Sequence, residues 1–487
     1  MTPAAIITVI SAYFAVILFI SWFTGRKSDN AGFFSGNRKQ SWYVVAIAMI
    51  GSAMSGVTFV SVPGMVATSG FGYMQMALGF IAGQIVIAFV LIPLFYRMNL
   101  VSIYGYLENR FGLSSYRTGA WFFFISKMLG ASVRLYLVCI ALQMMVFGPL
   151  GLLFIVNVAV TVLILIAYTF RGGVKAVIWI DFLKTFCMIV SIALCTIFIS
   201  KSLGFTFGSM CEAVAGSDMS RIFYFDDPDH PQYFFKQFFG GMFTLIAMTG
   251  LDQDMMQRSL TCKNFRDSQK NIITSALLQT VVIFLFLTLG VLLYFFAGAN
   301  GIDATGDTLF PAVATSELLP AVVGIVFVVG LVSCSYAAGG SALTALTTSF
   351  TVDILGTDGK SEKEVRSMRE KVHIGMAVCM GLTITVFNFI NNTSAIDAVY
   401  KLASYTYGPI LGMFAFGILT KRRTKDRCVP WISIIAPAIC LVLQLNSERW
   451  FGGYQFSYEL LIINALLTFI GLYLFSSKAD ALRAAKR

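Results

Sequence analysis

Long uncharged runs of hydrophobic residues, separated by short polar segments, dominate the chain. Each run has about 20 residues or more, the length that an α-helix needs to cross a bilayer. The runs lack the alternation of polar and apolar residues that is typical of barrel strands, so they predict transmembrane helices. We expect an all-α integral membrane protein with about thirteen spans, at roughly residues 4–23, 43–66, 73–98, 118–147, 150–170, 174–199, 235–254, 271–298, 319–352, 373–391, 396–420, 429–446 and 459–475.

The distribution of Lys and Arg predicts the orientation of these spans. Cations gather in alternate loops, as in Arg26 to Lys39, Arg258 to Lys270 and Lys421 to Arg423, whereas the loops between them carry few. Because cytoplasmic loops are enriched in Lys and Arg, we expect the N-terminus outside and the C-terminus inside. The expected location is a cell membrane, such as the inner membrane of a bacterium.

Composition excludes several other classes of protein. The net charge is +11, but the cations lie at the predicted membrane faces, so nucleic-acid binding is not indicated. Nine scattered Cys and two His, His230 and His373, have no spacing typical of a disulfide framework or a metal site. An integral-membrane enzyme or a channel remains a rival class, but no His cluster, nucleophile motif or group of acids supports an enzyme.

Small residues interrupt two of the predicted spans. The second span contains the Gly- and Ser-rich segment Gly51 to Gly64, and the seventh contains Gly240-Gly241 and Thr249-Gly250. Such segments allow a helix to unwind inside the membrane, although close helix packing is an equal alternative. Broken helices five spans apart are typical of transporters built from two inverted repeats.

A polar cluster and several motifs carry a resemblance to one known family. Residues Asp252 to Lys263 fit the motif DQ-x-x-x-QR-x-L-x-x-K, and Gly172 to Asp181 fit GG-x-x-AV-x-W-x-D. Further matches are Phe33 to Arg38 with FF-x-G-x-R, Ser341 to Asp353 with the eighth core helix of that family, and Gly408-Pro409 in the tenth. On these residues the chain resembles the sodium:solute symporter family.

The resemblance implies a leucine-transporter (LeuT)-like fold with a 5+5 inverted repeat and extra helices. Its parts would be an N-terminal helix and loop (1–42), the first repeat (43–199), the second repeat (235–420), and two C-terminal helices with a short tail (421–487). The implied function is secondary active symport of a small polar solute by a monomer, with Na⁺ as the usual coupling ion. A sugar or an organic anion such as sialic acid is the expected solute.

The expected sodium site departs from the family pattern. The resemblance places one sodium ion between the backbone carbonyls of Gly51 and Met54 and two hydroxyl positions, which here are Ala337 and Ala338. Methyl groups supply no oxygen to a hard cation. Cys334 and Ser341 flank the two alanines, and Ser333, Ser335, Ser341 or Thr344 would provide a ligand if the register is shifted.

A second departure concerns a charged pair near the same site. Where the family helix continues as D-x-x-Q, this chain reads Asp181-Phe-Leu-Lys184. One interpretation is a structural ion pair between Asp181 and Lys184. The other is that the Lys184 ammonium replaces sodium as a tethered cation near Gly51, Met54 and Ala337, which predicts sodium-independent or proton-coupled transport. Sodium coupling remains what the family resemblance implies.

Arg134 is the main candidate for substrate binding. It shares a helix face with Lys127, and an arginine inside a membrane span suits a bidentate contact with a carboxylate. The alternative is an ion pair with Asp181 or another buried acid. By resemblance to the sugar site of the family, further candidates are Ser55, Thr58, Gln75, Gln279, Tyr400 and Lys401, each of which could equally form an interhelical hydrogen bond.

Overall fold

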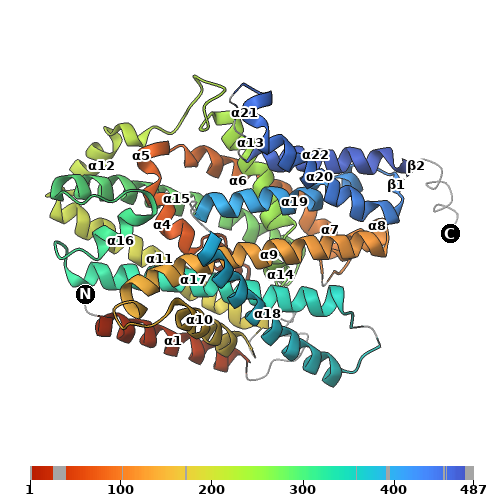
Figure 1. Ribbon diagram of the computed structural model, residues 1–487, viewed down its shortest axis with the longest axis horizontal. Helices are drawn as coiled ribbons and strands as arrows, with labels where there is room; N and C mark the ends of the chain where they lie inside the picture. The colour runs from red at the N-terminus through yellow and green to blue at the C-terminus, as the bar shows by residue number, and fades with distance from the viewer. Residues whose placement is uncertain are drawn as a thin grey trace.

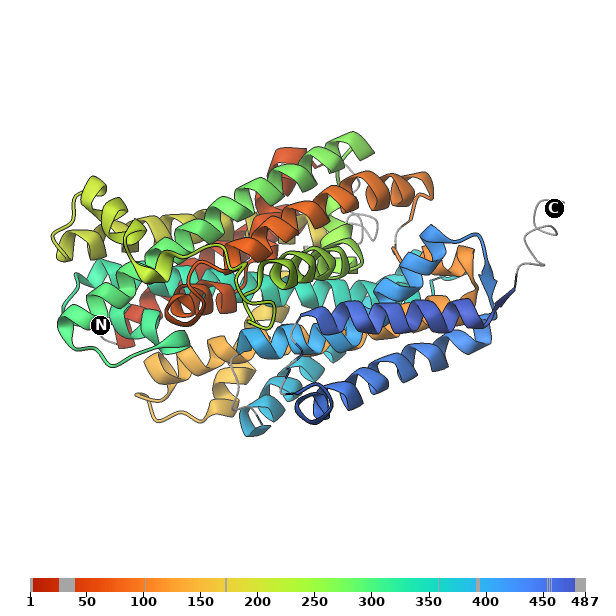
Figure 2. The same cartoon turned by 90° about the horizontal axis from the view of Figure 1, so that it is seen from above.

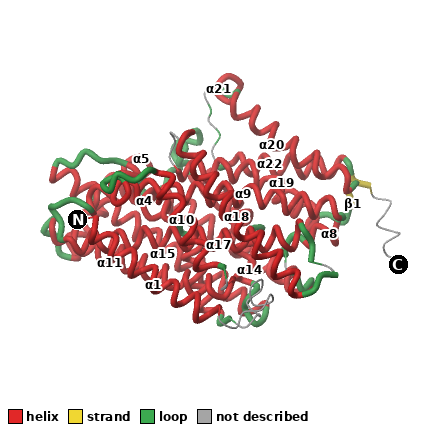
Figure 3. The backbone as a smooth tube through the Cα atoms, turned by 60° about the horizontal axis from the view of Figure 1, so that its bottom comes forward, coloured by secondary structure: helices red, strands yellow, loops and turns green. Residues whose placement is uncertain are grey.

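The computed structural model describes residues 3–25, 40–100, 102–170, 173–357, 359–390, 395–452, 454, 456 and 458–477. The motif at Phe33 to Arg38 lies outside the described residues, and so does the side chain of Tyr400. The described chain is almost entirely helical (Figure 3), and most helices run along the long axis of the molecule (Figures 1 and 2). The prediction of an all-α architecture is confirmed.

The elements are α1 (Pro3–Gly25), α3 (Trp42–Ala53), α4 (Gly56–Gly64), α5 (Val66–Ser69), α6 (Tyr73–Val86), η2 (Ile87–Leu91), α7 (Ile92–Arg97), α8 (Gly105–Arg110), α9 (Leu113–Leu142), η3 (Gln143–Phe147), α10 (Phe154–Thr169), α11 (Gly173–Ser202), α12 (Phe207–Ala215), η4 (Asp218–Ser220), α13 (Phe234–Leu245), η5 (Ile246–Gly250), α14 (Gln253–Ser259), α15 (Phe265–Asn300), η6 (Gly306–Thr308), α16 (Leu309–Ala314), α17 (Ala321–Ser349), η7 (Phe350–Ile354), α18 (Glu362–Ile390), α19 (Ala395–Leu419), β1 (Arg423–Thr424), η8 (Asp426–Cys428), α20 (Val429–Leu445), α21 (Ser447–Trp450), α22 (Glu459–Leu474) and β2 (Ser476–Ser477).

Each predicted span falls on helical structure in the described chain. Eight helices there are long and apolar enough to cross a membrane, and two bent helix pairs raise that number to as many as 10. Three shorter apolar helices, Ile7–Phe23, Phe154–Thr169 and Glu459–Leu474, coincide with the remaining predicted spans. The chain is therefore a multi-pass membrane protein, while the full number of spans stays a prediction.

The first bent pair confirms the predicted interruption of the second span. The axes of α3 and α4 differ by 62°, and Met54 and Ser55 between them have extended backbone angles. The Ser55 N–H donates to Thr58 Oγ1 at 3.3 Å, so the Thr58 side chain caps the new helix. The carbonyls at the end of α3 are left without intrahelical partners by this break.

The second bent pair interrupts the seventh span, as predicted. Here α13 passes into the π-helical turn η5, which ends at Gly250, and the chain bends by 71° before α14. Asp252 precedes α14 in an extended conformation, and its Oδ1 accepts a hydrogen bond from Met255 N–H at 3.1 Å. The carboxylate thus caps the helix and complements the positive end of its dipole.

Glycines hold α6 and α13 in close contact. A Cβ atom at Gly79 would lie 2.1 Å from the Phe238 carbonyl oxygen, and one at Gly241 would lie 2.5 Å from the Met76 carbonyl oxygen. Backbone atoms cannot yield as a flexible side chain can, so both positions require glycine. Elsewhere α11 packs against α3 and α17, and α9 packs against α17 and α19. These contacts gather both breaks around one interior region.

The two ends of the described chain lie at opposite ends of the bundle. Helix α1 begins at the end where α12 and α16 lie, and β2 ends the described chain at the other (Figures 1 and 2). Strands β1 and β2 form an antiparallel pair that the sequence pattern did not predict, with Arg423 opposite Ser477. Two residues per strand are too few for a recognisable period, and the pairing satisfies backbone groups that follow α19 and α22.

Candidate binding site at the helix breaks

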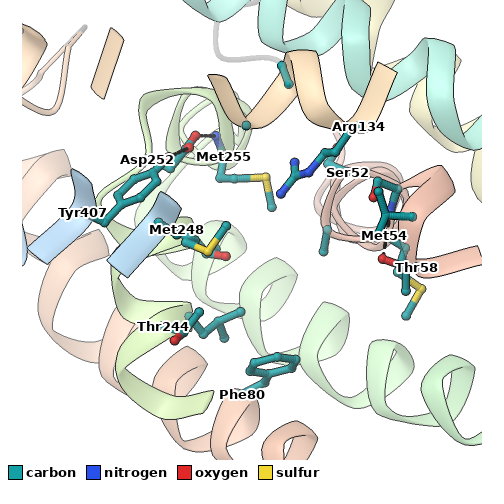
Figure 4. A pocket seen from close by; sticks show the side chains of 18 of the residues that line it. Ser52, Met54, Thr58, Phe80, Arg134, Thr244, Met248, Asp252, Met255 and Tyr407 are labelled. Atoms are coloured by element: carbon teal, nitrogen blue, oxygen red, sulfur yellow. Dashed lines mark hydrogen bonds between the residues drawn. The ribbon is translucent and has the colours of Figure 1, made fainter. Parts of the chain in front are cut away.

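A cavity lies beside both helix breaks. The space between its walls, including solvent at the opening, amounts to about 1070 Å³. Its walls come from α3, α4, α6, α9, α13, η5, α14, α15 and α19 (Figure 4). The polar lining residues are Ser52, Ser55, Thr58, Ser126, Lys127, Arg134, Thr244, Thr249, Asp252, Gln279 and Tyr407, and Tyr73, Phe80 and Met248 add aromatic and apolar surface.

Arg134 presents a cation to this cavity. It lies on α9, and Figure 4 shows its guanidinium pointing into the space among Ser52, Met255 and Met248. No carboxylate of the described residues lies within ion-pair distance of it, and the alternative partner Asp181 is instead bound to Arg258. A half-buried guanidinium in this position can bind an anion from solution.

Lys127, two turns away on the same helix, is neutralised by acids. Its Nζ lies 3.2 Å from Asp252 Oδ2 and 2.7 Å from Asp254 Oδ2, and all three side chains are almost fully buried. The Tyr407 hydroxyl of α19 also donates to Asp252. Because the two aspartates frame the start of α14, these contacts join α9, α14 and α19 at one side of the cavity.

The ion pairs continue from Asp254 toward α11. Arg258 Nη2 lies 2.8 Å from Asp254 Oδ1, and Arg258 Nε lies 3.3 Å from Asp181 Oδ2. The Ser52 hydroxyl of α3 donates to the same Asp181 oxygen at 2.8 Å. The DQ-x-x-x-QR segment thus places a chain of alternating charges between the second break and the first.

Lys184 of α11 is buried next to the end of α3. Its side chain is 0% exposed, and its Nζ has no hydrogen-bond partner among the described residues. A Cβ atom at Gly51 would lie 3.5 Å from Lys184 Cδ. The ion pair with Asp181 that the sequence allowed is not formed, because Asp181 binds Arg258. Lys184 is beside Gly51 as expected, but it is not among the residues that line the cavity.

The residues at the expected sodium position do not fit a sodium ion. Ala337 and Ala338 lie on α17, which packs against α11, and they offer no side-chain oxygen. Ser341 hydrogen-bonds Asp254 Oδ1 at 3.3 Å, which directs it to α14. Cys334 is fully buried, and Met54 lines the cavity. The two alanines thus lack the side-chain oxygens that the resemblance implies, and the side chain of Lys184 lies beside Gly51.

The other expected substrate residues divide between the cavity and elsewhere. Ser55, Thr58 and Gln279 line the cavity together with Arg134. Gln75 is fully buried outside it, where its amide nitrogen donates to Gln232 O at 2.8 Å and its amide oxygen accepts from Tyr224 N–H at 3.1 Å. Lys401 is exposed and does not line the cavity. The side chain of Tyr400 lies outside the described residues.

Several lining residues were not predicted from the sequence. Phe80, Thr244, Met248 and Tyr407 come from four different elements, α6, α13, η5 and α19. The only local signal was position: Thr244 and Met248 lie just before the small pair Thr249-Gly250, and Tyr407 directly precedes Gly408-Pro409. With 14% aromatic residues in the chain, residue type alone does not mark a gate or a stacking surface.

Comparison with known proteins settles the family. A sequence model of the sodium:solute symporter family matches residues 33–428, which is most of the chain. The chain belongs to the sodium:solute symporter family. It is accordingly a symporter for a small solute in a cell membrane and not an enzyme.

Relatives in this family are distant but extensive. The sodium/sialic acid symporter NanT of Aliivibrio fischeri is 25% identical over 457 residues, which cover 90% of this chain and 86% of that protein. The human sodium/iodide cotransporter is 24% identical over 422 residues, covering 82% of this chain and 63% of the cotransporter.

A solved structure establishes the fold. It is a Na⁺-coupled sialic acid symporter in a substrate-bound outward-open state, which superposes with a TM-score of 0.83 at 19% sequence identity and covers 98% of each chain. The fold is therefore LeuT-like, with the two broken helices in the places that an inverted repeat requires. The boundaries proposed for the two repeats, 43–199 and 235–420, stay predictions.

Proposed function

We propose that this member of the sodium:solute symporter family carries a small organic anion across the cell membrane by alternating access. The observation that carries the proposal is the uncompensated charge of Arg134 in the cavity at the two helix breaks. A carboxylate such as that of sialic acid would be the group that Arg134 binds.

The charges around the cavity favour an anion over a neutral sugar. Lys127 is matched by Asp252 and Asp254, so this part of the wall has no excess positive charge. Arg134 has no such partner in the described part of the chain, and a planar guanidinium binds a carboxylate through two parallel hydrogen bonds. A bound carboxylate would complete the charge balance that the protein leaves open.

The remaining polar groups suit a solute that also carries hydroxyls. Ser55 and Thr58 lie at the first break, and Gln279 faces them from α15. Thr58 accepts a hydrogen bond from the backbone, but its hydroxyl can still donate to a solute. Tyr73 and Phe80 provide aromatic faces against which a ring can pack. A polyhydroxylated carboxylate would use both parts of the site.

The names of the relatives support the same class of solute. NanT is named for sialic acid and the human cotransporter for iodide, and both of these solutes are anions. We place the N-terminus outside and the C-terminus in the cytoplasm on the distribution of Lys and Arg.

The first prediction tests Arg134. Purified wild type should bind sialic acid or a smaller carboxylate, and Arg134→Ala should lower this affinity about 10- to 100-fold, because charge-assisted hydrogen bonds contribute about 1.5–3 kcal/mol. Arg134→Lys should fall between the two, since a point charge lacks the bidentate fork. Binding is measured by calorimetry, and uptake of the labelled solute in proteoliposomes is measured under imposed sodium and proton gradients.

Ile125→Ala is the matched control, because Ile125 lies on the same helix with 44% of its surface exposed and does not line the cavity. Its affinity should equal that of wild type. A neutral sugar that binds wild type and Arg134→Ala equally well, with no carboxylate binding in either, would contradict the proposal and assign Arg134 a structural role.

A further inference from the structure

The ammonium group of Lys184 is a buried charge without an evident structural partner. The side chain is fully buried in the middle of α11, and no described acceptor lies within hydrogen-bond distance of Nζ. Asp181, one turn earlier, is occupied by Arg258 and Ser52. Charged residues inside membrane spans are costly and are kept mainly where they serve function. Lys184 is therefore a candidate for a role in the transport cycle.

Helix α3 supplies the first side of the space around Lys184. A Cβ atom at Gly51 would come within 2.5 Å of Thr185 Oγ1 and within 2.7 Å of the Asp181 carbonyl oxygen, so α3 and α11 are in contact at this point. The end of α3 carries carbonyl oxygens that lack intrahelical partners, and the negative end of the helix dipole reinforces them. A cation beside Gly51 is favoured by this geometry.

Helix α17 supplies the second side. It packs along α11, and Cys334 is among the groups that interact electrostatically with Lys184, together with Asp181, Arg258 and Arg134. The next turn of α17 carries Ala337 and Ala338. The nearby Ser335 faces α4, because a Cβ atom at Gly56 would lie 2.1 Å from its Oγ. The α17 side chains near Lys184 thus provide few oxygen ligands for a sodium ion. A lysine at this position needs no such ligands to place a positive charge there.

We infer that the Lys184 ammonium is the resident cation at the end of α3, in the position where the family resemblance places a sodium ion. The lysine supplies the charge that holds the α3 break against α11 and α17, and sodium does not bind at this position. The inference rests on the proposed function only in that the chain is a symporter. It concerns the cation, whereas the binding of the solute depends on Arg134.

The experiment compares wild type with Lys184→Ala in sodium, ammonium and choline chloride at equal ionic strength. The readout is the melting temperature of the purified protein in detergent without solute. The difference between the melting temperatures in sodium and in choline, which includes the effect of sodium bound elsewhere in the protein, should be smaller for wild type than for Lys184→Ala. Lys184→Ala should melt several degrees lower in choline, because the α3 carbonyls have lost their cation, and sodium or ammonium should restore part of the difference by entering the vacated space.

Lys184→Arg keeps the charge and serves as the conservative variant, with a melting temperature and a salt dependence near those of wild type. A sodium-specific stabilisation that is equally large in wild type and Lys184→Ala would overturn the inference. So would a Lys184→Ala protein as stable in choline as wild type. If Lys184→Ala does not fold, Lys184→Gln takes its place, and the same comparison of its sodium effect with that of wild type decides the outcome. None of these outcomes depends on the affinity for an anion, so failure here is distinguishable from failure of the proposed function.

Discussion

At the scale of single residues, the buried charges of this protein fall into two kinds. Lys127 and Arg258 are each shared between two carboxylates, and the carboxylate of Asp254 contacts both cations. Arg134 and Lys184 have no carboxylate within ion-pair distance in the described part of the chain. A paired charge contributes to structure, and an unpaired one must be stabilised by a ligand or by backbone dipoles. This difference is the basis for our proposals that Arg134 binds the solute and that Lys184 occupies the ion position.

The pair between Lys127 and Asp252 makes a prediction of its own. Removing only the cation leaves a buried carboxylate uncompensated, so Lys127→Met should lower the free energy of unfolding by about 3–5 kcal/mol. In the double variant Lys127→Met/Asp252→Asn the loss of unfolding free energy should be smaller. The Asp252→Asn change leaves no uncompensated charge at this position, and Asp254 still has Arg258 as a partner at 2.8 Å. Melting temperatures of the single and double variants measure the coupling. Equal stability of Lys127→Met and wild type would show that the pair adds nothing to the fold.

At the scale of elements, two breaks and one close helix contact organise the site. The breaks turn α4 and α14 away from the helices that precede them, by 62° and 71°. They also bring Ser55, Thr58 and Asp252 to the cavity wall. The contact between α6 and α13 fixes the position of Phe80 relative to Thr244, since Gly79 directly precedes Phe80 on α6 and Gly241 lies one turn before Thr244 on α13. The geometry of the cavity therefore depends on glycines that do not line it.

The close contact of α6 with α13 is testable with one methyl group. Gly79→Ala places a Cβ atom 2.1 Å from the Phe238 carbonyl oxygen. The helices must then separate, which should cost about 1–3 kcal/mol of stability. Gly298→Ala is the control, because it lies in α15 with nothing within 4 Å of the added atom. That change should be neutral or stabilising by up to about 1 kcal/mol through helix propensity. Thermal unfolding of both variants gives the comparison, and an equal effect at the two positions would refute the packing argument.

At the scale of the whole molecule, the termini of the described chain lie at opposite ends of the bundle (Figures 1 and 2). An odd number of membrane crossings requires this arrangement. The alternation of basic and neutral loops then predicts which end faces the cytoplasm. The two features together agree with an N-terminus outside and a C-terminus inside.

Reporter fusions test the orientation directly. A green fluorescent protein fused after Arg487 should be fluorescent in the cytoplasm, and a periplasmic phosphatase fused at the same position should be inactive, because the cytoplasmic loops hold most of the cations. The same pair of reporters fused in the acidic loop near Asp218 should give the opposite result. An active phosphatase at the C-terminus would reverse the proposed topology.

The sequence by itself determined the class, the helices and the two breaks. Hydrophobic runs and small-residue segments act locally, through the cost of exposing backbone to lipid and through the conformational freedom of glycine, so they can be interpreted without a partner. It also made Arg134 a candidate binding residue, because a cation in an apolar span is rare. The sequence also showed that Ala337, Ala338 and Lys184 differ from the family motifs, because a motif is compared residue by residue along the chain.

Only the tertiary structure decided which side chains contact one another. The sequence offered Lys184 or Arg134 as the partner of Asp181, but the packing of α11 against α14 brings Arg258 to it instead. Gln75 has the residue type of a substrate ligand, but its burial against the backbone of Gln232 and Tyr224 removes it from the cavity. Tyr407 gained a partner in Asp252 only through the crossing of α19 over the second break. Pairing depends on distances between helices far apart in the chain, and hydrophobicity and motif spacing carry no information about those distances.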